Sequence, residues 1–479
     1  MNQPTQTNAW KSLQDHARSR NSVDTSGKRP ATASACNITL DFSHQHISEE
    51  TLALLCALTE ELQVHAKIEA LIRGDKVNLS ESRPALHTAL RAPEDAAIWV
   101  DNHNVMTEII ATRRQMERIV DDIRNKVWLG FSGKPITDIV NIGIGGSDLG
   151  PRFCVDALAD YITTDLSYHF ISDSDPDSFI HVVKNLTPET TLFLVSSKSF
   201  TTQETLHNAQ KAMSWIGSRH QQHFIAITAN ISKAQQFGIT NILPIWEWVG
   251  GRYSFCSAIN LIAAIALGNE QFKQILAGAH SMDRHFHERK FAENLPVLLA
   301  LIGIWNNNFL NIHNLLLLVY TKHLEKFVPY IQQLDMESNG KSIDNQGNPV
   351  THATGPIIWG GLGNQAQHSY YQLLCQGTHK VSVDFITINT HRGKMINDMC
   401  TAKINVLSEG VHDQKNPSSL ISGDIPLNHL QIQTISPFTI GALVALYEHK
   451  IFVQSVIWDI NPFDQPGVES AKRNRLAFQ

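Results

Sequence analysis

The sequence has few cysteines, no excess of positive charge, and no apolar run long enough to cross a bilayer. Its 6 cysteines among 479 residues are scattered without a CxxC pair, so neither a zinc site nor a disulfide scaffold is indicated. The longest apolar stretches, 295–305 and 315–320, are too short to span a membrane, and we expect both to be buried. A net charge of −6 argues against nucleic acid as a partner, because phosphate backbones are bound mainly by an excess of Lys and Arg.

No secretory signal is visible in the polar residues 1–28, so we expect reduced thiols and a cytoplasmic protein. Residues 1–40 are rich in Ser, Thr and Asn, and we expect this segment to be at least partly loosely held. The chain has 23 His, but His280, His285 and His287 lack a recognised ligand spacing. We expect these three on solvated helix faces rather than at a metal.

Short apolar runs alternate with helical patterns through the middle of the chain. Strand-like runs lie at 137–144, 166–171, 191–196 and 223–229, and helical patterns separate them at 149–161, 202–216 and 232–237. This alternation predicts a parallel sheet with helices on both faces. The plan recurs, with strand-like runs at 315–320, 355–360 and 382–388 and a helix at 367–374. The sequence therefore predicts an α/β fold of two doubly wound parallel-sheet units, flanked by helices at 48–72, 104–125 and 439–458.

A glycine motif, NIGIGGSDLG at 141–150, follows the first predicted strand, and we predict that a helix begins at Ser147. Glycine lets backbone N–H groups approach an anion, and a helix N-terminus adds positive partial charge, so the motif favours phosphate binding. A dinucleotide fingerprint is the alternative, with Asp173 near the usual place of a ribose-binding acid. Asp148 stands where that fingerprint needs its third glycine, which disfavours this alternative.

A second anion site is indicated by SSKSFTTQET at 196–205, again between a predicted strand and a predicted helix. Thr201 and Glu204 have the spacing of a capping box, which accounts for two residues. Four hydroxyls and one cation remain at the helix start, a set suited to a phosphomonoester: Ser197, Lys198, Ser199, Thr202 and Thr205. The spacing does not fit a P-loop, so no nucleoside triphosphate is implied.

Four further residues are candidates for acid–base or electrostatic chemistry. Arg252, in WEWVGGRYS at 246–254, could face a developing oxyanion or could stack on a surface tryptophan. Glu337 precedes the turn-forming Ser-Asn-Gly and could be a general base on a loop, although surface Glu residues are common. His368, near a predicted helix start, could act as a neutral imidazole or be a buried, hydrogen-bonded His. Lys472 could reach a polar pocket or solvent.

Taken in order, these motifs resemble the glucose-6-phosphate isomerase family. The stretches that match the family's order and general spacing are NIGIGGSDLGP, SSKSFTTQET, WVGGRYS, QQLDMESNGKS, GNQAQHSYYQLLCQGT and DQPGVESAK, and similarity extends from about Asp41 to the C-terminus. The resemblance implies two sugar-isomerase (SIS-type) units. We expect a poorly matched segment at 1–40, a helical region at 41–125, the two units at 126–270 and 271–448, and C-terminal helices with a lysine loop at 449–479.

The resemblance also implies reversible isomerisation of glucose 6-phosphate to fructose 6-phosphate through ring opening and a cis-enediolate, without metal, nucleotide or other cofactor. In this interpretation Glu337 moves the proton, Arg252 stabilises negative charge, and His368 and Lys472 assist ring opening. The implied substrate-binding residues are Ser147, Ser197, Lys198, Ser199 and Thr202 at the phosphate, with Gly146, Gln333 and Gln465 lining the pocket. In the family the residue at His368 comes from the neighbouring subunit, so a homodimer is expected.

The chain departs from the family pattern at a few positions. Ser199 replaces the more usual Thr, Ser470-Ala471 replaces Leu-Gly before Lys472, and residues 172–175 differ from the familiar strand end. None of these changes removes a proposed catalytic group. Two other functions stay open from sequence: a non-catalytic sugar-phosphate-binding regulator built from the same units, and a nicotinamide-dependent enzyme.

Overall fold

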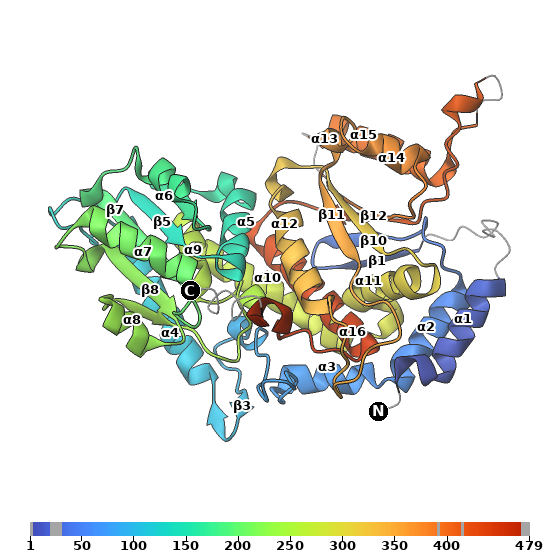
Figure 1. The fold of residues 1–479 in the computed structure, drawn as a ribbon, viewed down its shortest axis with the longest axis horizontal. Helices are drawn as coiled ribbons and strands as arrows, with labels where there is room; N and C mark the ends of the chain where they lie inside the picture. The colour runs from blue at the N-terminus through green and yellow to red at the C-terminus, as the bar shows by residue number, and fades with distance from the viewer. Residues whose placement is uncertain (1–2, 20–30, 390–392, 413–415, 471–479) are drawn as a thin grey trace.

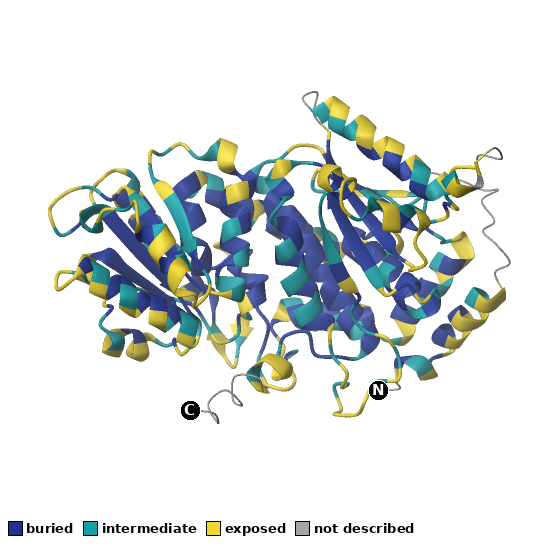
Figure 2. Ribbon diagram, turned by 45° about the horizontal axis from the view of Figure 1, so that its top comes forward, coloured by how far each residue is buried: buried dark blue, intermediate teal, exposed yellow. Residues whose placement is uncertain are grey.

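The computed structural model describes residues 3–19, 31–389, 393–412 and 416–470 (Figure 1). Two β-sheets lie toward opposite ends of the elongated molecule, and long helices fill the space between them. The strands and the central helices are the most deeply buried elements, whereas the outer helices expose one face (Figure 2). The molecule is therefore two α/β units joined by a shared helical core.

The first sheet has five parallel strands in the order β6-β5-β7-β8-β9. Its strands are β5 Asp138–Ile142, β6 Ser167–Ile171, β7 Thr191–Ser196, β8 Phe224–Thr228 and β9 Ile242–Pro244, and its crossover helices are α5 Leu149–Ala157, α6 Pro176–Val183, α7 Gln203–Ile216 and α8 Ile231–Phe237. In β7, Phe193 and Val195 pack with α6, α7 and α8, whereas Leu192 and Leu194 join the main core. The predicted strands and helices of this unit are confirmed to within a few residues, and β9 is added to them.

The second sheet has six strands in the order β1-β2-β13-β12-β10-β11. Its parallel strands are β10 Asn314–Val319, β11 Ile357–Leu362, β12 Ser382–Ile388 and β13 Leu427–Ile432. In β10, Leu316 and Leu318 pack on the side of α13 Gly363–Ala366, α14 Tyr371–Gln376 and α15 Lys394–Glu409, while Leu315 and Leu317 face the main core. The three predicted strands are confirmed, β13 was not predicted, and the helix expected at 367–374 begins at Tyr371.

This second sheet is mixed rather than wholly parallel, because the N-terminal part of the chain adds two antiparallel strands. β1 Thr32–Ala35 pairs with β2 Ile38–Asp41, and β2 pairs with β13. Residues 8–19 form α1 Asn8–Ser19, with Trp10 and Leu13 fully buried. Segments that we expected to be loosely held thus complete the sheet edge and cover the core.

The remaining helices pack around and between the two sheets. They are α2 Glu49–Glu61, α3 Val64–Arg73, α4 Met106–Arg124, α9 Leu261–Leu267, α10 Asn269–Glu288, α11 Leu295–Ile304, α12 Phe327–Ile331 and α16 Pro437–Trp458, with a small hairpin of β3 Trp99–Val100 and β4 His103–Asn104. Helix α2 has Ser48 as its N-cap, because Ser48 Oγ accepts from the Thr51 N–H in a capping box.

Helix α16 is the centre of this core. Among the described residues it alone is long and apolar enough to cross a membrane by length and composition, but 94% of its apolar window is buried inside the protein. It packs against α10 and α11, and it crosses α10 with backbones almost in contact. A Cβ on Gly441 would lie 1.9 Å from the carbonyl oxygen of Ile275, and one on Gly278 would lie 1.8 Å from that of Phe438. Each helix therefore needs a glycine where it meets the other.

We expect Gly441→Ala to destabilise the protein, because its new methyl group would force α16 away from α10. Overpacking of this kind costs ~1–3 kcal/mol. Chemical denaturation followed by circular dichroism measures the loss. Gly467→Ala is the matched control, since a Cβ there meets no atom within 4 Å and the backbone has no left-handed φ. Equal stability of the Gly441→Ala variant and the parent would contradict the close crossing.

Candidate active site

The two predicted phosphate motifs meet at one edge of the first sheet. The chain passes from β5 to β6 on one side of β5, and then to β7 on the other side. The connections at the adjacent carboxyl ends of β5 and β7 therefore diverge, which opens the kind of crevice where α/β proteins bind ligands. The loop at 143–148 leaves β5, and the loop at 197–202 leaves β7.

The loop at 143–148 needs glycine at two positions. Gly145 has φ +60°, in the left-handed region. A Cβ on Gly146 would lie 2.1 Å from the carbonyl oxygen of Gly251, so a side chain there would separate this loop from the loop at 250–252. Asn141 steadies the loop by donating from Nδ2 to the Ser147 carbonyl oxygen at 2.9 Å. The glycines thus bring the first phosphate motif against the segment that carries Arg252.

The helix after this loop begins at Leu149, after a 3-10 turn, and not at Ser147 as predicted. Asp148 forms an ion pair with Arg152 at 2.8 Å, and burial raises the pKa of the Asp148 carboxyl. Asp173, the candidate ribose ligand, accepts from the Ser178 hydroxyl at 3.0 Å and from a backbone N–H at 2.9 Å. Both acids have structural partners within the chain, which weakens the dinucleotide alternative.

The hydroxyls of the loop at 197–202 bond to one another. Ser197 Oγ donates to Thr202 Oγ1 at 3.3 Å, and the hydroxyls of Ser199 and Thr201 share a bond of 2.6 Å. Phe200 is buried and has φ +49°, which turns the backbone at the middle of the loop. The predicted capping box is wrong: Thr202 is the N-cap residue of α7, it makes no side-chain cap, and Thr201 bonds to Ser199 instead.

Lys198 is tied to the neighbouring loop through Glu247. Its Nζ donates to the Glu247 carbonyl oxygen at 2.8 Å and lies 3.5 Å from the Glu247 carboxylate. Burial lowers the pKa of the Lys198 ammonium. Glu247 also pairs with Arg83 at 2.7 Å. The cation of the second phosphate motif is therefore held beside the segment that runs on to Arg252.

Arg252 is only 3% exposed, and acceptors from distant segments surround its guanidinium. These are Ser338 Oγ on Nε (2.7 Å), Gln465 Oε1 on Nη1 (3.0 Å), and the carbonyl oxygens of Pro462 (2.5 Å) and Asp464 (2.9 Å) on Nη2. Trp246 and Trp248 stack on each other, with ring centroids 4.9 Å apart. The alternative of a surface Arg stacked on tryptophan is therefore wrong, and Arg252 is a fixed, buried positive charge.

Glu337 ends a π-helical segment, Gln332–Glu337, that continues directly from α12. The prediction of a loop carboxylate is wrong, since helical backbone extends through Asn339. The Glu337 side chain is 22% exposed, and both carboxylate oxygens have a partner. Oε1 lies 3.3 Å from Arg252 Nη1, and Oε2 accepts from Gln333 Nε2 at 2.8 Å. π-Helical turns are frequent at functional sites, and this one places Gln333 and Glu337 on the same side of the helix.

The two units meet at this carboxylate. A Cβ on Gly145 would lie 2.8 Å from Gln333 Nε2, so the glycine loop of the first unit touches the π-helical segment of the second. The structure thus brings Gly146, Arg252, Gln333, Glu337 and Gln465 together from four separate stretches of sequence.

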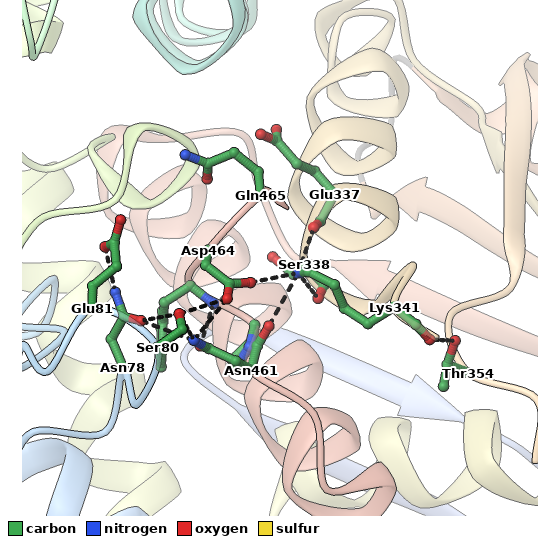
Figure 3. A network of polar contacts seen from close by, with 12 residues as sticks. Asn78, Ser80, Glu81, Glu337, Ser338, Lys341, Thr354, Asn461, Asp464 and Gln465 are labelled. Carbon is green, nitrogen blue, oxygen red and sulfur yellow. Dashed lines mark hydrogen bonds and ion pairs between the residues drawn. The ribbon is translucent and has the colours of Figure 1, made fainter. Parts of the chain in front are cut away.

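Sequence reasoning missed Lys341, which lies inside the quoted motif QQLDMESNGKS. Figure 3 shows its ammonium among acceptors from the Glu337 segment and from the loop at 461–465. Asp464 in turn accepts from Ser80 Oγ at 2.6 Å and from Asn461 Nδ2 at 3.2 Å. A cavity of about 760 Å³ opens beside this network. A lysine four residues after Glu337 is the only sequence signal for it.

His368 and Lys472 are not joined to this cluster by the described residues. His368 is exposed in the turn at 367–370 between α13 and α14. Within the described part of the chain, its ring forms no hydrogen bond or ion pair with Glu337 or Arg252. His368 was expected near a helix start, and it lies three residues before α14, which begins at Tyr371. Lys472 lies outside the described residues.

The expected solvated histidines differ among themselves. His285 is half-buried and its Nε2 accepts from the Leu295 N–H at 3.0 Å, and burial lowers its pKa to about 4. His287 is exposed as expected. Within residues 3–19, 31–389, 393–412 and 416–470, no group of three or more His, Cys, Asp or Glu could hold a metal ion.

Comparison with known proteins gives an independent view of the whole chain. Curated relatives named glucose-6-phosphate isomerase include one from Legionella pneumophila strain Lens, 60% identical over 437 residues that cover 91% of this chain and 88% of the relative. Another, from Deinococcus radiodurans, is 42% identical and covers 98% of this chain and 93% of the relative.

Solved structures agree with these relatives. The crystal structure of a glucose-6-phosphate isomerase from Chlamydia trachomatis superposes with a TM-score of 0.91 at 30% identity, covering 99% of this chain and 95% of that one. A hypothetical protein from Thermus thermophilus shares the fold, with a TM-score of 0.72 at 21% identity over 92% of this chain. The family model described as phosphoglucose isomerase matches residues 41–477. The resemblance seen in the sequence motifs is confirmed, and the chain belongs to the phosphoglucose isomerase family.

Proposed function

We propose that this protein catalyses the reversible isomerisation of D-glucose 6-phosphate and D-fructose 6-phosphate. The single observation that carries the proposal is the Glu337 carboxylate, which is held between Arg252 and Gln333 and touches the glycine loop of the first unit through Gln333. A carboxylate poised between a cation and an amide can take a proton from one carbon and return it to the next. The relatives named for this reaction cover most of the chain.

In this proposal Glu337 is the base that moves a proton between C2 and C1. The hydrogen next to a carbonyl is only weakly acidic, so its removal needs a positioned base, whose contribution is typically ~10²–10⁴-fold. As Glu337 becomes protonated, negative charge moves onto the enediolate oxygens. Arg252 is buried and already fixed by backbone carbonyls, so it can stabilise that charge without reorganising.

The phosphate is assigned to the two loops at the carboxyl edge of the first sheet. The proposed ligands are Ser147, Ser197, Lys198, Ser199 and Thr202, with the N-terminus of the 14-residue α7 beneath them. Hydroxyl and backbone donors at a helix N-terminus suit a phosphomonoester. Gly146, Gln333 and Gln465 are proposed to line the space between these loops and Glu337. Binding the phosphate away from the reacting carbons orients them toward the base.

Ring opening and the oligomer belong to the same proposal. His368 is exposed in its turn, which supports a role on the surface that meets a second copy of the chain. We propose that a homodimer forms, that His368 enters the neighbouring site, and that Lys472 acts with it on the sugar ring. We further propose that the protein works in the cytoplasm and that its chemistry uses side chains without a metal or nucleotide.

A non-catalytic sugar-phosphate-binding regulator is the alternative left from sequence. Such a protein would need the two phosphate loops, but it would not need the Arg252–Glu337 pair. A half-buried carboxylate next to a buried guanidinium, with both oxygens oriented, supports proton transfer rather than binding alone. No observation favours the regulator.

We expect Glu337→Gln to lower kcat for fructose 6-phosphate by at least ~10²-fold, because the amide cannot accept the proton. Binding of the sugar phosphate should change little, since the phosphate loops belong to the other unit. A coupled assay measures turnover, and calorimetry measures binding. The parent enzyme should keep its activity in the presence of a chelator. Normal turnover by the variant would remove Glu337 as the base.

For the phosphate loop, Ser197→Ala should raise the KM for fructose 6-phosphate by roughly tenfold, as expected for a lost hydrogen bond to a charged group. Inhibition by inorganic phosphate should weaken by a similar factor. Ser214→Ala in α7, the helix that follows this loop, is the matched control, because its hydroxyl bonds to the Gln210 carbonyl oxygen on an exposed face. If KM and phosphate inhibition are both unchanged, the phosphate does not bind at Ser197.

The shared site predicts complementation between subunits. Glu337→Gln and His368→Ala homodimers should both be nearly inactive. When the two are denatured and refolded together, mixed dimers should contain one intact site. We expect recovery of up to roughly a quarter of the parent activity from statistical mixing, as the symmetry of a two-fold dimer requires. No recovery in verified mixed dimers would contradict a His368 donated across the interface.

A further inference from the structure

We propose that Lys341 is a positioning residue that fixes the distance between Glu337 and Arg252 by binding the segments that hold them. The inference rests on the proposed isomerisation and extends it to a residue that touches neither the Glu337 carboxylate nor the guanidinium.

Lys341 is the meeting point of the two segments that hold the acid–base pair. Its side chain is only 11% exposed. Nζ donates to the carbonyl oxygens of Glu337 at 3.0 Å and Ser338 at 2.8 Å, and to that of Asn461 at 3.0 Å. It also lies 3.4 Å from Asp464 Oδ1. Figure 3 shows these contacts converging on one ammonium group. Its three hydrogens are thus shared between the Glu337 segment and the loop at 461–465.

The first set of contacts holds the end of the helical segment that carries the base. Carbonyl oxygens at a helix C-terminus lack backbone partners and carry partial negative charge, so an ammonium stabilises them. By binding the carbonyls of Glu337 and Ser338, Lys341 fixes the backbone from which the carboxylate extends. The Ser338 hydroxyl also accepts from Arg252 Nε. Lys341 and Arg252 therefore both bind the short segment formed by Glu337 and Ser338.

The second set of contacts positions the loop at 461–465, which binds Arg252. The guanidinium donates to the carbonyl oxygens of Pro462 and Asp464. Lys341 binds the same loop through the Asn461 carbonyl and the Asp464 carboxylate. The loop is secured from its far side by Ser80, which donates to Asp464. Lys341 therefore contacts the supports of both members of the pair.

Leaving the buried Lys341 ammonium without these partners would cost free energy. Burial lowers the pKa of the Lys341 ammonium to about 8, and the nearby Arg252 acts in the same direction, while Asp464 and Glu337 oppose it. A buried ammonium that lost one segment would have to recover its acceptors elsewhere. A shift of ~1 Å at a reacting group can cost ~10²-fold in rate, so an anchor shared by base and cation bears directly on turnover.

The test is a steady-state comparison near pH 7 with fructose 6-phosphate and the full-length protein. Lys341→Met keeps the length of the side chain and removes its charge. We expect kcat to fall by about 10²-fold while KM stays within about threefold, because the proposed phosphate ligands lie on the other unit. The kcat of Lys341→Arg should be at least tenfold higher than that of Lys341→Met. Lys322→Met is the matched control and should behave as the parent, since Lys322 is an exposed lysine paired with Glu325 at the surface.

Each outcome of this comparison decides something. A Lys341→Met variant with parental kcat, or one whose only defect is a raised KM, overturns the inference. If Lys341→Met does not fold, Asp464→Asn is used instead: a lowered kcat at unchanged KM supports the inference, and parental kinetics overturn it. A parent protein without isomerase activity would instead contradict the proposed function, which separates the two failures.

Discussion

The buried guanidinium of Arg252 is the constraint on which the rest of the site depends. A cation almost without solvent is tolerated only when its donors are satisfied, and here the acceptors come from residues 337–338 and 462–465. Satisfying one side chain therefore brings together segments more than a hundred residues apart. The glycine at 146 completes the arrangement, because it lets the backbone around Arg252 lie against the first phosphate motif.

In the proposed mechanism the two units have different tasks. Hydroxyls and the Lys198 cation belong to loops of the first sheet, whereas the carboxylate belongs to the helix that follows β10 in the second. The helices between the sheets join the two units, and α10 and α16 cross closely there at Gly278 and Gly441. A tightly packed core transmits strain between its elements. The distance between the phosphate loops and the carboxylate therefore depends on packing throughout the molecule.

Sequence patterns predicted the parts of this molecule that depend on local signals. The strand at 191–196 is apolar at its four central positions, 192–195, because both of its faces are buried, and such runs are visible without a structure. β13 and the strands at 32–35 and 38–41 are partly polar, so their apolar signal is weak. β13 pairs with β12 and with β2, which is distant in sequence, and β2 forms a hairpin with β1. The turn residues after Glu337 suggested a loop, but the helix extends through them, where Asn339 Nδ2 donates to Asp335 and Ser338 Oγ accepts from Arg252. Lys341 carries no motif of its own, and its place is defined by contacts 120 residues away.

The pairing of Lys198 with Glu247 has a consequence for how quickly the site can empty. If Lys198 takes up the phosphate as proposed, it must first leave the Glu247 carboxylate, so ligand capture is an exchange of one anion for another and not the filling of an open positive site. When product departs, Glu247 is in place to take the ammonium back. The intramolecular carboxylate thereby limits how tightly any phosphate is held, which favours short residence times in an enzyme whose substrate and product carry the same phosphate group.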